Sequence, residues 1–145
     1  MDTFLRKILL VDDNPNDVEL TIAALRENNF ANEIVVANDG VEALDYLYKR
    51  GKFAEHSDAN PVVILLDIKM PRMNGLEVLK EVKKDEKLKT IPIIMLTSSK
   101  EERDLMESYK FGTNAYVEKP VDIEEFIDAI KILGQFWGLV NISPS

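Results

Sequence analysis

The stretch KILLVDDNPND, residues 7–17, decides the fold, because an apolar run in it ends at two adjacent carboxylates. The four apolar residues ILLV (8–11) are branched and continuous, which is typical of a strand buried on both faces of a parallel sheet. Asp12 and Asp13 follow at once. Neighbouring carboxylates repel each other unless a cation or a shifted pKa compensates. The stretch therefore predicts a buried strand that delivers acids to its carboxyl end.

Similar apolar runs recur along the chain and alternate with segments of helical spacing. The other strand candidates are VVILL (62–66), IPIIML (91–96) and the weaker EIVVA (33–37) and AYVE (115–118). The helical segments carry apolar stripes at Val18, Ile22 and Leu25; at Val41, Leu44, Leu47 and Tyr48; at Leu76, Leu79 and Val82; at Leu105, Met106 and Tyr109; and at Ile123, Phe126, Ile127, Ile130 and Leu133. Strand–helix alternation repeated five times predicts a doubly wound α/β fold, with a parallel sheet and helices on both faces.

Composition limits the classes of function. The chain has 145 residues, of which 46% are hydrophobic, and its 18 basic against 26 acidic residues give a net charge of -8. Nonspecific binding to nucleic acid or to an anionic membrane needs basic patches, so neither is expected. The absence of cysteine excludes disulfides, thiol catalysis and zinc–thiolate sites. We expect one cytoplasmic domain over residues 1–145, with a frayed tail near 141–145 and no output domain.

Chemically informative residues stand at the carboxyl ends of four predicted strands. The first strand ends at Asp12 and Asp13, the third at Asp67, the fourth at Thr97 and Ser98, and the fifth at Lys119 and Pro120. Ligands of doubly wound sheets bind beyond these ends, at the point where the strand order reverses. If the first and third strands are neighbours, the three aspartates converge there. One such acid alone also fits a solvated loop or a helix cap, but their joint occurrence at the strand ends favours a site.

Three converging carboxylates need a counter-ion, and an all-oxygen ligand set suits Mg²⁺. One oxygen of Asp67 would bind the ion, and the other could attack phosphorus to form an aspartyl phosphate. The ion, the Lys119 ammonium and the Thr97 hydroxyl would stabilise the charge on the transferring group. A cis bond between Lys119 and Pro120 is also expected.

The chain resembles the receiver domains of two-component response regulators. The matching pieces are ILLVDDNP, NDGVEAL, VILLDIKMPRMNGLEVL, IPIIMLTSS and GTNAYVEKP, in family order over nearly the whole chain. The resemblance implies the flavodoxin-like strand order 2-1-3-4-5. It implies that Asp67 accepts phosphate from a histidine kinase, and that Asp12, Asp13 and the backbone carbonyl of Lys69 help to bind Mg²⁺ or Mn²⁺. Such a protein is not an enzyme in the usual sense, since it catalyses only its own phosphorylation and dephosphorylation.

The resemblance also implies a switch and a kind of partner. Thr97 and Tyr116 match the switch pair of the family, although Tyr116 also fits an ordinary edge-strand aromatic. Three segments resemble those of stand-alone receivers paired with cyanobacterial phytochromes, which are light-sensing kinases: KRGKFAEHSDANP, SYKFGTNAYVEKPVD and FWGLVNISP. Phe136 and Trp137, where the last helix is expected to continue, fit either the core or a homodimer interface. His56, in the polar loop 51–60, is expected to be a solvated surface residue.

Three other functions fit parts of the pattern. A haloacid dehalogenase-type phosphatase needs a second Asp two positions after its nucleophile, but Asn14 stands two positions after Asp12. A flavin carrier of this topology needs hydroxyls and amides after the first strand, where this chain has carboxylates that repel phosphate. A receiver that acts without phosphorylation remains open, although every acid, hydroxyl and lysine of the site is present.

Overall fold

The five strands form one parallel sheet in the order β2-β1-β3-β4-β5, as predicted. The computed structural model describes residues 6–109 and 115–133. The strands are β1 (Ile8–Val11), β2 (Ile34–Ala37), β3 (Val63–Asp67), β4 (Ile93–Thr97) and β5 (Ala115–Glu118). The helices are α1 (Pro15–Glu27), α2 (Gly40–Tyr48), α3 (Gly75–Lys84), α4 (Lys100–Tyr109) and α5 (Ile123–Leu133), with a short 3₁₀ helix at Gly51–Phe53. Within the described ranges, no helix is long and apolar enough to cross a membrane.

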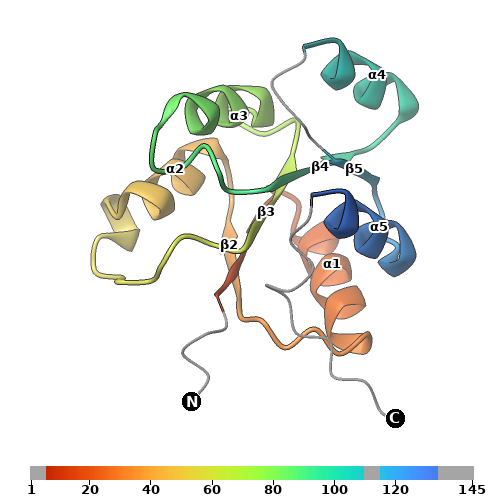
Figure 1. The fold of residues 1–145 in the computed structure, drawn as a ribbon, viewed down its shortest axis with the longest axis horizontal. Helices are drawn as coiled ribbons and strands as arrows, with labels where there is room; N and C mark the ends of the chain where they lie inside the picture. The colour runs from red at the N-terminus through yellow and green to blue at the C-terminus, as the bar shows by residue number, and fades with distance from the viewer. Residues whose placement is uncertain (1–5, 110–114, 134–145) are drawn as a thin grey trace.

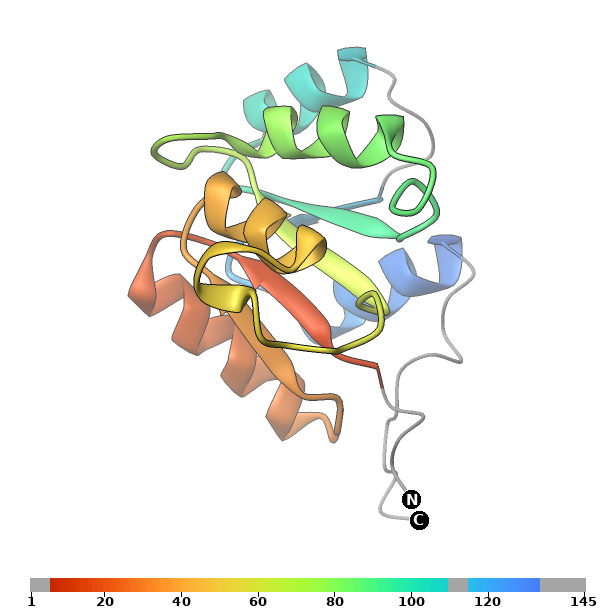
Figure 2. The ribbon, with the colours of Figure 1, turned by 90° about the vertical axis from the view of Figure 1, so that its left-hand side faces the viewer.

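Both faces of the sheet are buried, which explains the continuous apolar runs. In β1, Leu9 and Val11 belong to the core that α2 and α3 cover, whereas Ile8 and Leu10 belong to the core beneath α1 and α5. All four side chains are inaccessible to solvent. Figure 1 and the perpendicular view in Figure 2 show α1 and α5 on one side of the sheet, with α3 and α4 on the other. Burial on two sides requires apolar residues at successive positions and not at alternate ones.

The third and fourth strands carry Asp67 and Thr97 at their carboxyl ends, as predicted. β3 includes Asp67 and β4 includes Thr97, so each of these residues is the last one of its strand. The register pairs Asp67 with Leu96 and Thr97 with Glu118. The pairing of β3 with β4 and of β4 with β5 therefore fixes the backbone of both residues, which limits how far their side chains can move.

A helix cap turns the chain shortly after β1 ends. Asn14 caps α1, and its side-chain oxygen accepts hydrogen bonds from the backbone N–H groups of Asn16 and Asp17. Pro15 occupies the first turn, where its missing N–H costs nothing. The chain thus leaves β1 and enters α1 through a short connection that consists of Asp12, Asp13 and the capping residue Asn14. This short connection keeps the acids at the edge of the sheet.

The polar loop 51–60 folds back onto α2, and the prediction of a solvated His56 is wrong. The His56 ring stacks on Tyr46 with 4.2 Å between centroids, and its Nε2 lies 2.7 Å from the Tyr46 carbonyl oxygen. Asp58 anchors the loop through the Tyr46 hydroxyl, at 2.9 Å, and through Lys7 Nζ, also at 2.9 Å. Tyr46 lies 10 residues from His56 and 12 from Asp58, and Lys7 is more distant still, so composition alone could not reveal these contacts. Phe136, Trp137 and the tail at 141–145 lie outside the described residues.

Candidate functional site

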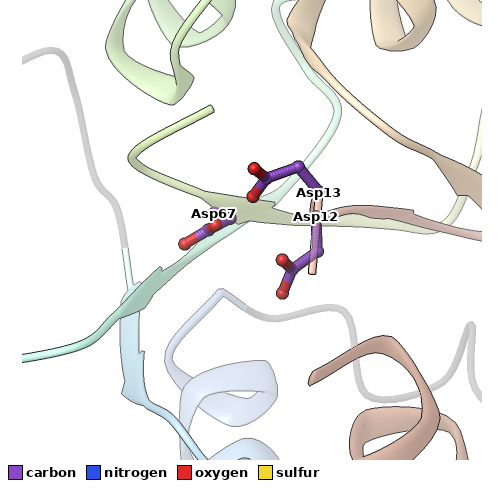
Figure 3. Close-up of side chains that lie close together, drawn as sticks. All are labelled: Asp12, Asp13 and Asp67. Atoms are coloured by element: carbon purple, nitrogen blue, oxygen red, sulfur yellow. The ribbon is translucent and has the colours of Figure 1, made fainter. Parts of the chain in front are cut away.

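Three carboxylates meet at the carboxyl ends of the two central strands, as the sequence predicts. One oxygen of each of Asp12, Asp13 and Asp67 lies within 4.8 Å of the others. β1 and β3 are hydrogen-bonded neighbours, with Val11 paired to Leu66, so the residues that follow reach the same edge. Figure 3 shows Asp12 and Asp13 leaving β1 beside Asp67 of β3. Asp12 and Asp67 are buried and Asp13 is exposed, which leaves the cluster open to solvent on one side.

Lys119 extends from the end of β5 into the same cluster. Its ammonium lies 3.2 Å from Asp12 Oδ2 and 3.2 Å from Asp67 Oδ1, and its shortest contact is 2.8 Å to Asp17 Oδ2. The side chain is only 11% exposed. The backbone N–H of Lys119 donates to the Thr97 carbonyl oxygen at 2.8 Å, and the peptide bond to Pro120 is cis, as expected.

The electrostatics of the cluster show how crowded the negative charge is. Burial, and then the charge of Asp12, raise the pKa of Asp67 to about 6, although Lys119 and the Ile68 N–H pull it down. Burial alone would lower the pKa of Lys119, but Asp17, Asp67 and Asp12 outweigh it and raise that pKa above its ordinary value. The Lys119 ammonium thus lies among three carboxylates, those of Asp12, Asp17 and Asp67, and Asp13 adds a further negative charge beside Asp12 and Asp67. A divalent cation would relieve this imbalance, and three clustered carboxylate oxygens are a donor set that fits Mg²⁺.

The other predicted residues lie around this cluster. Thr97 is buried at the end of β4, next to β3. Tyr116 is half-buried on β5, with the Arg103 guanidinium carbon 5.5 Å from its ring centroid. The Lys69 side chain is 83% exposed, with Nζ 3.7 Å from Glu102 Oε2. The roles predicted for the Thr97 hydroxyl, the Tyr116 ring and the Lys69 carbonyl remain predictions.

A salt bridge that was not predicted from the sequence holds the loop after β3. Arg72 donates two hydrogen bonds to Asp39, at 2.7 Å from Nε and 3.1 Å from the guanidinium end, and Asp39 also caps α2. Burial opposes ionisation of Asp39, but Arg72 and the Glu42 N–H prevail and lower its pKa. The loop is further tied down where Gly40 N–H donates to the Met73 carbonyl at 3.1 Å. The motif NDG indicates a cap but not its arginine partner, 33 residues away.

Asp17 is the second residue that was not predicted. It lies in the first turn of α1, where an acid is common because it complements the helix dipole. Because this local role explains the acid by itself, the sequence gives no reason to expect its contact with Lys119, which is 102 residues away in the chain. Only the folded sheet shows the pairing, because β5 and α1 meet at the same edge.

The strand order and this acidic site define the class of the protein, a receiver domain of two-component signalling. The family model described as the response regulator receiver domain matches residues 8–131, and the chain belongs to this family. Receiver domains take up a phosphoryl group from histidine kinases and are signalling phosphoacceptors, not enzymes that act on a separate substrate.

Several relatives are similar over most of their length. The response regulator Rcp1 of Synechocystis sp. is 32% identical over 130 residues, which cover 90% of this chain and 87% of Rcp1. The solved bacteriophytochrome response regulator AtBRR is 54% identical with a TM-score of 0.90, covering 95% of this chain and 99% of its own. The phosphorylated cyanobacterial phytochrome response regulator RcpA is 37% identical with a TM-score of 0.71, covering 97% and 99%.

Proposed function

We propose that Asp67 accepts a phosphoryl group from the phosphohistidine of a sensor histidine kinase, in a reaction that requires Mg²⁺. The observation that carries the proposal is the place of Asp67: buried, 3.2 Å from the Lys119 ammonium, and within a cluster of three carboxylates. A carboxylate oxygen of Asp67 forms the new bond to phosphorus while the bond from phosphorus to the histidine nitrogen breaks. The products are an aspartyl phosphate and a free histidine on the kinase.

The residues around Asp67 have separate tasks in this proposal. Asp12, Asp13, Asp67 and the backbone carbonyl of Lys69 would hold Mg²⁺, and Mn²⁺ could replace it. The bound ion would supply positive charge to the phosphoryl oxygens. Lys119 adds a second positive charge, and the Thr97 hydroxyl donates a hydrogen bond. The same groups would serve the hydrolysis that returns Asp67 to its free state, so the protein catalyses only its own cycle.

The new phosphoryl group would be sensed through Thr97 and Tyr116. Thr97 moves toward the phosphoryl oxygens, the space it vacates admits the Tyr116 ring, and the face formed by α4, β5 and α5 changes. Tyr116 begins half-buried beneath Arg103, so the rotation is a further inward step from that position.

The kind of kinase is inferred from the relatives. AtBRR and RcpA are named as response regulators of bacteriophytochrome and phytochrome, and the 54% identity to AtBRR supports a phytochrome-type partner for this chain. The net charge of -8 favours protein partners over nucleic acid or anionic membranes. A homodimer, a cytoplasmic location and a single-domain organisation over residues 1–145 remain predictions.

Phosphorylation by a small donor tests the phosphoacceptor directly. Incubation with acetyl phosphate and Mg²⁺ should add one phosphoryl group to the wild type, as read by intact-protein mass spectrometry and located by peptide mapping. Asp67→Asn should take up none, whereas Asp104→Asn, the same change on the exposed surface of α4, should behave as the wild type. Equal labelling of the Asp67→Asn variant at this strand end would refute the assignment. Many equivalents of phosphate released from a generic phosphomonoester would favour the phosphatase alternative.

Lys119→Ala separates metal binding from switching. The variant should still bind Mg²⁺, because the three carboxylates remain, but should lose the change at Tyr116 that follows phosphorylation. Tyrosine fluorescence or kinase affinity with the phosphoryl mimic beryllofluoride reports this change. Full switching in Lys119→Ala would show that the switch does not need the lysine.

A further inference from the structure

Asp17 contacts the site lysine more closely than either carboxylate of the acidic cluster does. Its Oδ2 lies 2.8 Å from Lys119 Nζ, against 3.2 Å for Asp12 and for Asp67. A charge-assisted hydrogen bond of this length is among the stronger polar contacts in proteins. The Asp17 side chain is 30% exposed and the Lys119 side chain 11%, so water screens the pair only in part.

The three partners of Lys119 are not equivalent. The oxygens of Asp12 and Asp67 belong to the group that fits a metal ion, and Asp67 is also the proposed phosphoacceptor. During phosphoryl transfer, the metal ion or the phosphoryl group would compete with Lys119 for the oxygens of both carboxylates. Asp17 lies outside that group and approaches Lys119 from α1. Its carboxylate therefore stays available to the ammonium throughout.

Accordingly, we infer that Asp17 is a positioning residue: it anchors the Lys119 ammonium beside Asp67 so that the charge is in place when the phosphoryl group arrives. The inference rests on the proposed function of Asp67. Lysine carries its charge on a flexible four-carbon stem. A fixed partner restricts the conformations of this stem before the reaction, so less conformational entropy is lost on reaching the transition state. Asp17 is itself held, because its backbone N–H donates to the Asn14 cap at 3.1 Å.

The test compares Asp17→Asn with Glu19→Gln, which makes the same change of charge on the exposed side of α1. Asp17→Asn should slow phosphorylation by acetyl phosphate about tenfold, the low end for a lost hydrogen bond between charged groups. Its Mg²⁺ affinity, measured by calorimetry, should change far less than its rate. Asp17→Glu, which restores the carboxylate, should recover part of the rate. Glu19→Gln should match the wild type in every assay.

Two further measurements distinguish anchoring from a general effect of charge or stability. In the Lys119→Ala background, Asp17→Asn should cause no additional loss of rate, because the group it positions is gone. In Mg²⁺-free protein, the ¹⁵N-detected ammonium protons of Lys119 should exchange with water faster in Asp17→Asn than in the wild type or Glu19→Gln. This second readout does not depend on phosphorylation.

The outcomes separate the two proposals. Wild-type phosphorylation together with an unaffected Asp17→Asn rate would overturn the role of Asp17 alone. The role of Asp17 is also overturned if Asp17→Asn slows the reaction equally with and without Lys119. If the wild type takes up no phosphoryl group, the proposed function fails and the positioning role fails with it.

Discussion

Gly75 lies so close to the end of β3 that adding one methyl group there should reverse the usual effect of replacing a helical glycine. Gly75 is the first residue of α3, and its N–H donates to the Ile68 carbonyl oxygen at 2.8 Å. A Cβ at this position would lie 3.0 Å from Ile68 Cα and 3.1 Å from the Asp67 carbonyl carbon, with the Asp67 carbonyl oxygen nearer still. All three atoms are backbone and cannot rotate away.

The sign of the effect follows from two opposing contributions. In an unobstructed helix, alanine in place of glycine stabilises by about 1 kcal/mol. Overpacking that forces backbone to shift costs roughly 1–3 kcal/mol, and the upper value applies here because the neighbouring atoms are held in the sheet. The difference is a net destabilisation of about 2 kcal/mol for Gly75→Ala. The shift would also move Asp67, so phosphorylation should slow as well.

Urea unfolding followed by circular dichroism measures the stability change, and acetyl phosphate labelling measures the chemistry. Lys84→Ala, at the exposed end of the same helix, is the matched control and should be nearly neutral. If Gly75→Ala unfolds at the same or a higher urea concentration than the wild type, the close approach does not constrain this glycine, and the reasoning is refuted.

Two further predictions follow from the charges around the site. The pKa of Asp67 is raised to about 6 in the folded protein, against about 4 in the unfolded chain. Mg²⁺-free protein should therefore lose stability as the pH rises from about 4 to about 6. Asp67→Asn, which cannot ionise, should be more stable than the wild type at pH 7.5 by up to about 3 kcal/mol, and this difference should vanish near pH 4. The lowered pKa of Asp39 has the opposite sign, since its contribution is lost as the pH falls through the acid range. Asp39→Asn keeps the cap of α2 and should lose only the salt-sensitive pairing with Arg72, whereas Asp39→Ala should lose about 1 kcal/mol more. Thermal unfolding across pH and NaCl concentration checks both.

The features that could be predicted from the sequence are those that depend on short runs of neighbouring residues. ILLV at 8–11 identified β1 without error, because burial on two faces leaves no room for a polar residue. The acids Asp12, Asp13 and Asp67 could be assigned to one edge because parallel strands all end there. The strand order itself came from the family resemblance and not from periodicity, since alternation of strands and helices is compatible with more than one order.

The features that could not be predicted are pairings between distant residues. Three ion pairs join segments that come together only in the folded state: Arg72 with Asp39, Lys119 with Asp17, and Lys7 with Asp58. Each partner also has an ordinary local explanation, as a helix cap, a first-turn acid or a loop residue. Local patterns therefore underestimate how much of a site is made of contacts across elements.

The crowding of charge at this site connects its chemistry to the fold. Asp67 is buried at the end of a rigid strand, and its raised pKa shows that its negative charge is costly there without a cation. Lys119 relieves part of that cost but is itself shared among three carboxylates, so its charge is not fully available to any one of them. A change in the charge at Asp67 must therefore redistribute the contacts of Lys119, and Lys119 follows the β5 strand that carries Tyr116. A local change of charge at Asp67 thus has a short, physically continuous route to β5, and through β5 to the face of α4, β5 and α5 that we propose binds partners. This route exists because the sheet brings both strand ends to one edge.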